Sequence, residues 1–165
     1  MSTNQGASVW GNLFKKRDPW ALQVASLWSQ TPLFAGIPKR EIAILSKNMH
    51  ARKYKAGEFI FHSGDQGAGA AIILSGKIEI RAGEAVLASL AEGDFFGEIS
   101  LVLDELRTAD AVATEDTELV FFLRAELDRW IQRAPHHGAR LGTNLAHILA
   151  KRLSKANEML AEKEN

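Results

Sequence analysis

Residues 95–111, FFGEISLVLDELRTADA, hold the side chains whose types and spacing are best suited to bind a small anion. Gly97 and Glu98 open a short helix-like run, and Arg107 and Thr108 follow an acidic turn. A glycine lets a ligand come close to the backbone, and the first N–H groups of a helix are free to bind an anion. The Arg107 guanidinium can hold two oxygens of that anion, and Thr108 adds a hydroxyl donor.

Glu98 is the wrong side chain for an anion, because a carboxylate repels a phosphate. It fits if it accepts a hydrogen bond from a neutral donor on the same ligand, such as a sugar hydroxyl. A hydrogen bond to a charged group contributes about 1.5–3 kcal/mol. A phosphate and a sugar hydroxyl held side by side describe a nucleotide whose phosphate is folded close to its ribose.

The chain that positions these residues divides by sequence pattern into four parts. Residues 1–18 form an N-terminal extension, and residues 19–50 have the pattern of helices. Residues 51–124 contain short apolar runs separated by glycines, which is typical of strands and turns. Residues 125–165 return to a helical pattern.

The helical parts have recognisable boundaries. Asp18 followed by Pro19 predicts a helix start, and Pro135 predicts the end of the helix AELDRWIQR. A longer helix is expected from about Ala139 to Lys163, with leucines along one stripe. We expect this stripe to pack on the rest of the domain or, in its later part, to pair with a second copy of the chain.

The central part predicts an antiparallel β structure. Strand-length runs such as EFIFH, AAIIL, KIEIR and AVLASL lie between glycines, and alternation places Ile78 and Ile80 on one face. Many short strands with glycine turns favour a β jelly roll or barrel over βαβ units. The expected fold is therefore mainly β, with N-terminal helices and a long C-terminal helix on its flanks.

The segment GDFFGEISLVLDELRTADAVA resembles the phosphate-binding cassette of cyclic nucleotide-binding domains. LFAGIPKREIAILSKNMHARKYKAGEFIFHSGDQG and IILSGKIEI are similar to the opening helix, first strands and next hairpin of that family, so the resemblance covers about residues 25–150. Many members have proline before the arginine, where this chain has Leu106. The resemblance implies a set of ligand-binding residues: Phe96, Gly97, Glu98, Ile99, Ser100, Arg107, Thr108 and Ala109.

The resemblance also implies a role for each position. Glu98 would accept from the ribose 2′-hydroxyl, Arg107 would pair with the cyclic phosphate, and Thr108 would bind the phosphate or the base. Ala109 stands where the family has a small residue. The backbone at three positions would cap the phosphate: Gly97, Ile99 and Ser100.

The function implied is that of a regulatory module without catalytic activity. It would bind cAMP or cGMP as a regulatory ligand, use no cofactor, and signal to a separate effector protein by moving its C-terminal helix. One alternative is a relative that has lost its ligand and acts as a protein-interaction scaffold. A second is a metal-dependent jelly-roll enzyme of the cupin type.

Composition narrows the choice of partners. The 20 basic and 20 acidic residues give zero formal net charge. This argues against binding of nucleic acid through an overall positive charge of the chain. With no cysteine, disulfides and thiolate chemistry are excluded.

The N-terminus lacks the pattern of a secretion signal, and no apolar run approaches a membrane span of about 20 residues. A cytoplasmic protein without a helix-turn-helix is expected.

The positions of the histidines bear on whether the chain is a metal-dependent enzyme of the cupin type. A cupin-type metal site needs several histidines and a glutamate around one ion. His50 is expected at the end of a helical stretch and His62 stands alone in its strand, while His136 and His137 are adjacent and His147 lies on the last helix. We expect all five to be surface or packing residues.

The N-terminal extension contains an apolar and basic run, SVWGNLFKKR. We expect Val9, Trp10, Leu13 and Phe14 to pack on the domain as an extra helix. Docking to a partner or contact with a membrane surface is the alternative for this segment.

Overall fold

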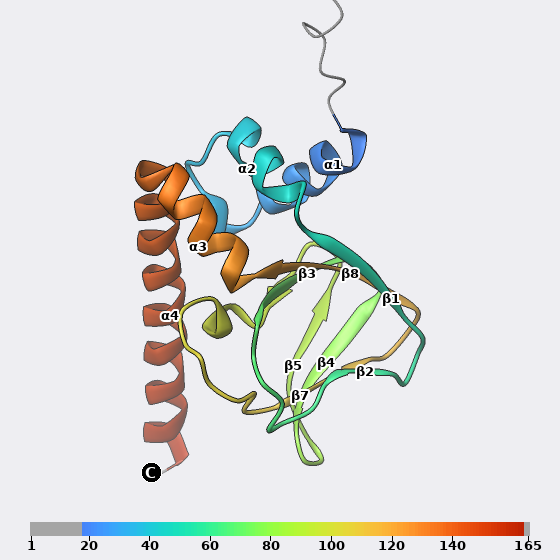
Figure 1. Cartoon of the computed structure of the whole chain (residues 1–165). Coiled ribbons are helices and arrows are strands. Elements are labelled where there is room, and N and C mark those ends of the chain that lie inside the picture. The colour runs from blue at the N-terminus through green and yellow to red at the C-terminus, as the bar shows by residue number, and fades with distance from the viewer. Residues whose placement is uncertain (1–17, 164–165) are drawn as a thin grey trace, which may run out of the picture.

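The structure is a computed structural model and describes residues 18–163 (Figure 1). Its helices are α1 (Pro19–Trp28), α2 (Lys39–Ser46), α3 (Arg124–Arg133) and α4 (Pro135–Lys163), with 3₁₀ turns η2 (Pro32–Phe34) and η3 (Glu98–Leu101). Its strands are β1 (His50–Tyr54), β2 (Phe59–Phe61), β3 (Gly69–Ser75), β4 (Lys77–Ala82), β5 (Ala85–Ala91), β6 (Phe95–Phe96), β7 (Asp110–Ala113) and β8 (Thr117–Leu123).

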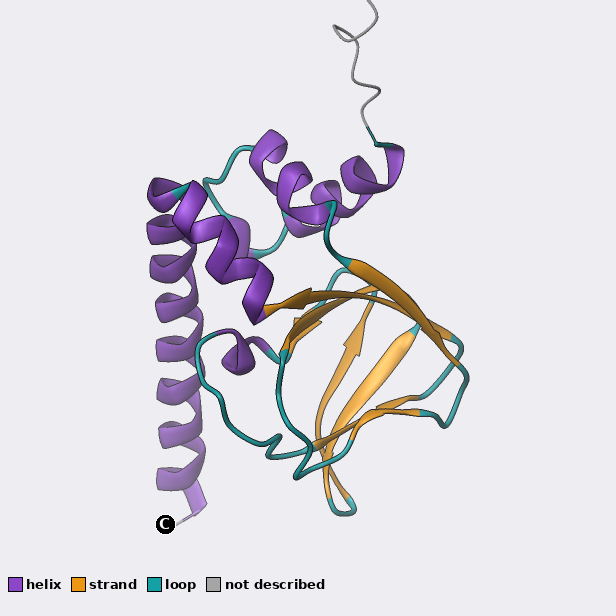
Figure 2. Cartoon of the chain, viewed as in Figure 1, coloured by secondary structure: helices purple, strands orange, loops and turns teal. Residues whose placement is uncertain are grey.

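The strands form two four-stranded sheets, in the orders β1-β8-β3-β6 and β2-β7-β4-β5. All strand pairs are antiparallel, and the two sheets enclose an apolar interior. The helices gather at one end and along one side of this β unit (Figure 2). The expected jelly roll with flanking helices is therefore confirmed.

Strand β3 explains why AAIIL reads as a continuous apolar run. Ala71 and Ile73 pack into the interior between the sheets, whereas Ala70 and Ile72 pack into the cluster under the helices. A strand that is covered on both faces needs apolar side chains in both directions. The register Ile72 opposite Val120 puts β8 into the same two environments.

The helical end is organised around Trp28, which is fully buried at the end of α1. Its ring lies 5.3 Å from Phe34, 6.1 Å from Phe122 and 6.1 Å from Phe95, measured between centroids. Aromatic pairs at these separations add about 0.5–1.5 kcal/mol each beyond simple burial. Because Phe95 belongs to β6, this cluster ties the N-terminal helices to the segment that precedes Gly97.

One helix boundary agrees with the sequence prediction and two boundaries differ from it. The Asp18 side chain accepts a hydrogen bond from the Trp20 N–H at 3.0 Å, and Pro19 is the first helical residue, as predicted. His50 begins β1 rather than ending a helix, because α2 stops at Ser46. The last helix begins at Pro135 instead of about Ala139, since proline is compatible with a first helical position.

Helix α4 has two different halves. In the first, Leu141 and Leu145 are buried, and Asn144 Nδ2 donates to the carbonyls of Leu33 at 3.0 Å and Ala35 at 2.9 Å. From residue 150 to residue 162 every residue is exposed. The first half is therefore anchored to the helical end, and the second runs past the β unit (Figure 1).

The apolar and basic run at Val9–Arg17 lies outside the described residues, so its packing stays a prediction. Within residues 18–163, no helix combines the length and the apolar character needed to cross a bilayer.

The anchor of α4 can be tested with Asn144→Ala. Loss of its two hydrogen bonds is expected to lower the free energy of unfolding by about 1–2 kcal/mol, measured by urea denaturation. Thr143→Ala is the matched control, because the hydrogen bond of the Thr143 hydroxyl within residues 18–163 goes to the Ala139 carbonyl of its own helix. The control should change stability by no more than about 0.5 kcal/mol; equal losses in both variants would contradict the anchor.

Candidate functional site

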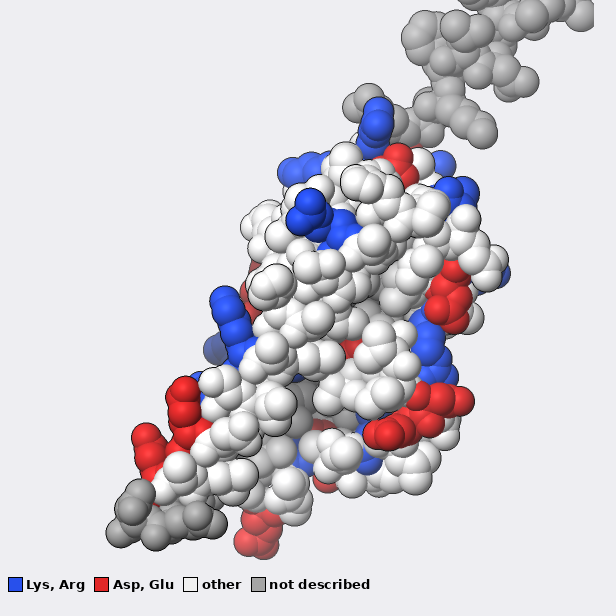
Figure 3. All heavy atoms as spheres, turned by 90° about the vertical axis from the view of Figure 1, so that its left-hand side faces the viewer, with Lys and Arg blue, Asp and Glu red and all other residues white. Residues whose placement is uncertain are grey.

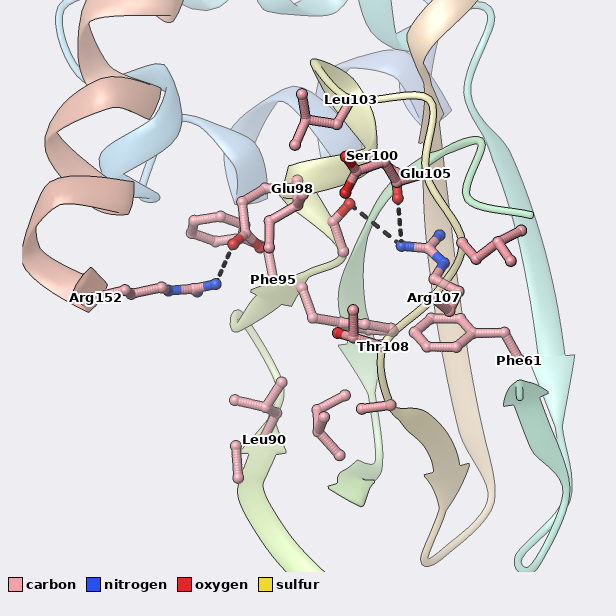
Figure 4. A pocket seen from close by; sticks show the side chains of 17 residues that line it. Phe61, Leu90, Phe95, Glu98, Ser100, Leu103, Glu105, Arg107, Thr108 and Arg152 are labelled. Atoms are coloured by element: carbon pink, nitrogen blue, oxygen red, sulfur yellow. Dashed lines mark hydrogen bonds and ion pairs between the residues drawn. The ribbon is translucent and has the colours of Figure 1, made fainter. Parts of the chain in front are cut away.

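One pocket of about 580 Å³ lies between the cassette, strands of the second sheet and α4 (Figure 4). This volume is in the range of small-molecule sites, which are commonly about 300–1,000 Å³. All the residues that were predicted from the sequence to bind a ligand line this pocket: Phe96, Gly97, Glu98, Ile99, Ser100, Arg107, Thr108 and Ala109. The structure brings them together; their roles toward a ligand stay predictions.

Two phenylalanines hold the start of the cassette in place. Phe96 pairs with Ala71 and Phe95 with Ile72 in the ladder between β6 and β3. Phe95 packs toward the helical cluster and Phe96 into the interior of the β unit. Gly97 therefore leaves a strand that is anchored on both faces.

Gly97 is required at its position for two reasons. Its φ of 75° lies in the left-handed region, which residues with a Cβ rarely adopt. A Cβ there would also lie 2.8 Å from Nη1 of Arg107 and 3.1 Å from the Gly69 carbonyl oxygen. The glycine thus allows the Arg107 guanidinium to lie against the backbone.

The short helix predicted after Gly97 is confirmed as η3, a single 3₁₀ turn of four residues. So short a helix sums few peptide dipoles, so its positive end is weaker than that of a full α-helix. Of the predicted anion partners, the Arg107 guanidinium is therefore the one that brings a full positive charge.

Arg107 points into the pocket wall and away from bulk solvent. Nη1 donates to Ser100 Oγ at 2.9 Å and to the Gly97 carbonyl at 3.4 Å, while Nη2 donates to the Gly69 carbonyl at 2.9 Å. The guanidinium also lies over the Phe61 ring, 4.2 Å from its centroid. Arg107 is thus held flat in one orientation between cassette and barrel.

The electrostatics of Arg107 reflect this burial. Burial lowers the pKa of its guanidinium below the usual value, and the charges of Glu98 and Asp65 oppose that shift. Arginine starts so far above neutrality that it stays protonated. Its Nε is buried and has no hydrogen-bond partner among the described residues, which leaves one donor of a charged group unsatisfied.

Glu98 lies on the opposite side of the pocket and is only 1% exposed. Its Oε1 forms an ion pair and hydrogen bond with Nη1 of Arg152, which reaches across from α4 (Figure 4). Its Oε2 is buried without a hydrogen-bond partner among the described residues. The sequence analysis expected further site residues on the last helix but did not identify Arg152.

The turn between η3 and β7 is held by backbone and by a second arginine. The Arg107 N–H donates to Asp65 O at 2.7 Å, and Gly64 N–H donates back to Arg107 O at 2.8 Å. Asp104 pairs with Arg124 at 2.6 Å, so Asp104 is not the partner of Arg107. This hydrogen bond from Arg124 keeps the pKa of Asp104 below its usual value.

The rest of the pocket wall is largely apolar. Phe61, Ile80, Ala88 and Leu90 line it from the barrel side, with Thr108 near the arginine (Figure 4). A flat apolar group would fit against such a wall, with polar groups at two fixed points. Among residues 18–163 no cluster of three or more histidine and carboxylate side chains could hold a metal ion.

Comparison with known proteins agrees with this geometry. The family model described as cyclic nucleotide-binding domain matches residues 51–134. The chain is 36% identical over 132 residues to the cyclic AMP receptor protein of Thermus thermophilus, covering 77% of this chain and 59% of that protein. It is 31% identical over 135 residues to the CRP-like cAMP-activated global transcriptional regulator of Mycobacterium tuberculosis H37Rv, covering 79% of this chain and 58% of that protein.

A solved structure shows the same relationship. The crystal structure of the Thermus thermophilus catabolite activator protein matches with a TM-score of 0.72 and 35% identity, over 81% of this chain and 63% of that one. The chain thus spans about three-fifths of the length of these relatives. With the family model covering half of the sequence and the cassette in place, this chain belongs to the cyclic nucleotide-binding domain family.

Proposed function

We propose that this chain is a regulatory module that binds cAMP, or secondarily cGMP, in the pocket between Glu98 and Arg107 and passes the signal to a separate effector protein. The observation that carries the proposal is the placement of one arginine and one buried carboxylate on opposite sides of a pocket of about 580 Å³. A cyclic phosphate fused to a ribose presents both an anion and a hydroxyl donor, the two kinds of group that an arginine and a carboxylate bind.

The phosphate is assigned to Arg107 and the backbone around Gly97. A guanidinium forms charge-assisted hydrogen bonds to phosphate oxygens, and its planar shape favours two at once. Its protein acceptors are neutral, namely the Ser100 hydroxyl and two carbonyls. An anionic acceptor forms the stronger bond, so it can replace one of them.

The sugar is assigned to Glu98 and the base to the apolar wall. The ribose 2′-hydroxyl can donate to the carboxylate, and a purine can pack against residues such as Leu90 and Ile80. The relatives named above carry cyclic AMP in their names, which favours cAMP as the first ligand to test. Thr108 can donate to the phosphate with either nucleotide.

The scaffold alternative is favoured by one observation. The two side chains assigned to the ligand already have intramolecular partners, Arg152 for Glu98 and Ser100 with two carbonyls for Arg107. If the chain is a scaffold that binds no ligand, adding nucleotide should leave its melting temperature unchanged. Binding at 100 times the dissociation constant instead stabilises the fold by about 2.7 kcal/mol.

The ligand assignment is tested by calorimetric titration of the wild type and Arg107→Ala with cAMP and cGMP. The variant is expected to bind the nucleotide roughly 10- to 100-fold more weakly, because a hydrogen bond to a charged group contributes about 1.5–3 kcal/mol. Arg129→Ala on α3 removes the same charge from an exposed site outside the pocket and should bind normally. Unchanged affinity in Arg107→Ala would place the ligand elsewhere.

The glycine requirement is tested by a matched pair of substitutions. Gly97→Ala should weaken nucleotide binding at least about tenfold and lower stability by about 1–2 kcal/mol, because it strains φ and displaces Arg107. Gly142→Ala lies in α4 with no atom within 4 Å of the new Cβ. It should bind normally and gain about 0.5–1 kcal/mol of stability from helix propensity. Normal binding by both variants contradicts the close-approach argument.

We also propose that the outer half of α4 pairs with a second copy of the chain. Leu153 and Leu160 are 63% and 61% exposed, and with Leu149 and Ala156 they recur at near-heptad spacing. Figure 3 faces this side of the molecule and shows mostly uncharged residues with single charged groups among them. An exposed apolar helix face is suited to pair with the same face of a second copy.

Sedimentation equilibrium tests this pairing. The wild type is expected to sediment as a dimer, and Leu153→Ser combined with Leu160→Ser as a monomer with an unchanged far-ultraviolet spectrum. Leu87→Ser on the β unit, where Leu87 is 59% exposed, controls for loss of any exposed leucine. A wild type that is monomeric at all concentrations rules out pairing through α4.

A further inference from the structure

Another cavity lies at the helical end of the molecule, where α2 and α3 face each other (Figure 1). Its volume is about 280 Å³, just below the range of about 300–1,000 Å³ that is common for small-molecule sites. It shares no lining residue with the nucleotide pocket. We call this cavity the α2–α3 groove, and its size suits a side chain of a partner protein better than a whole ligand.

Helix α3 brings two free positive charges to the groove. The helical repeat puts four of its residues on this face: Glu126, Arg129, Trp130 and Arg133. Arg129 and Arg133 are exposed, and neither guanidinium has an ion-pair partner among residues 18–163. Residues four apart are neighbours on a helix surface, so both guanidinium groups can reach the same acidic segment.

The floor of the groove is apolar. Leu45 and Trp130 are buried beneath it, and Ile44 lies at its edge with 36% of its surface exposed. The Trp130 Nε1–H group has no acceptor within residues 18–163, and the side-chain amide of Asn48, which also lines the groove, has no hydrogen-bond partner there either. The groove therefore combines apolar surface with donors that the described part of the chain does not use.

The carboxylate in the lining is already engaged. Glu126 Oε2 accepts a hydrogen bond from the Leu123 N–H at 3.3 Å at the start of α3, and its Oε1 lies 3.8 Å from His50 Nε2. Its side chain is buried, whereas both arginines of the groove are exposed. Asp128 is exposed on α3 but does not line the groove. A partner that approaches from solvent therefore meets the arginines rather than a carboxylate.

The charge at the edge of the groove favours an acidic partner. Lys47, three positions after Ile44, is exposed and has no ion-pair partner among residues 18–163. Carboxylates form charge-assisted and often bidentate hydrogen bonds with arginine. Nucleic acid fits less well, because its binding needs a longer cluster of positive charge and no apolar floor. Carboxylates combined with an apolar side chain match all parts of the groove.

We propose that the α2–α3 groove is a docking site for an acidic segment of a partner protein. Its carboxylates pair with Arg129 and Arg133, and one of its apolar side chains packs against Ile44 and Trp130. This inference does not rest on nucleotide binding, because the two cavities have no lining residue in common.

The first measurement is fluorescence anisotropy of a labelled peptide made of glutamate and leucine, added to the full chain. The wild type is expected to bind it, and Arg129→Ala combined with Arg133→Ala should bind about 5- to 30-fold more weakly, because two exposed arginine–carboxylate pairs are lost. Lys151→Ala combined with Lys155→Ala is the matched control, since it removes two exposed positive charges at the same spacing from α4. Equal affinities of the two double variants contradict the proposal.

The apolar contact is measured with the same peptide. Ile44→Ala should weaken binding about 3- to 10-fold, because the partner covers apolar surface there. Leu22→Ala on α1 is its control: Leu22 is 41% exposed, close to the 36% of Ile44, but lies outside the groove. Equal effects of the two substitutions argue for a general loss of exposed apolar surface and against this groove.

Heteronuclear NMR of the indole N–H groups locates the bound peptide. Trp130→Phe identifies the Trp130 signal by its loss, and in the wild type this signal should shift when peptide is added. Trp28 is the internal control, because its Nε1–H is also buried without a partner within residues 18–163 but does not line the groove. Bound peptide that leaves the Trp130 signal unmoved overturns the proposal.

The remaining comparisons separate this inference from its alternatives. A peptide with glutamine in place of every glutamate should not bind, and equal binding rules out the charge pairing. A single-stranded oligoribonucleotide that binds more tightly than the acidic peptide identifies nucleic acid as the partner and overturns the choice of a protein segment. Arg107→Ala should bind the acidic peptide normally, so loss of nucleotide binding and loss of docking are read independently. No binding of acidic peptide to the wild type overturns the docking site alone.

Discussion

A carboxylate buried in an apolar pocket must have a donor, and the Glu98 carboxylate imposes this constraint on the whole site. Glu98 cannot turn to solvent, because β6 and η3 hold it inside the wall of the pocket. Its donor therefore has to come from elsewhere, from a distant part of the chain or from a ligand. The structure supplies Arg152, and the proposed nucleotide supplies a hydroxyl.

On the other side of the pocket, the orientation of the Arg107 side chain is set by the space around it rather than by an ion pair. Gly97 without a Cβ, the Ser100 hydroxyl and the Phe61 ring leave one flat slot for the Arg107 guanidinium. Backbone hydrogen bonds between the 64–65 turn and residue 107 fix where its side chain begins. They also hold the turn that contains Leu106, so the rigidity of this turn comes from backbone hydrogen bonds. A second arginine, Arg124, forms an ion pair with Asp104 in the turn that precedes Arg107.

The packing of the helices connects this site to the rest of the molecule. Phe95 belongs to the Trp28 cluster, while Phe96, Gly97 and Glu98 follow directly and form the site. The cassette therefore begins on a rigid element, as precise sites require. Helix α4 is rigidly anchored only through its first half, so the element that faces the pocket from outside is the one best able to move. This division into anchored and exposed parts suits the proposed ligand-dependent signal.

The sequence by itself determined the element types and the cassette side of the pocket wall. Glycine spacing, the apolar runs and the Asp18–Pro19 start signal are local features, and so is the ten-residue separation of Gly97 and Arg107 within one loop. Local features act through nearby atoms, which is why the nominated cassette residues do share one pocket. The start of α4 at Pro135 and of β1 at His50 were misplaced because proline and histidine fit either side of a boundary. Only the tertiary structure decided the partner of Glu98, because the contact with Arg152 depends on how a helix anchored by Leu141 and Asn144 passes the β unit.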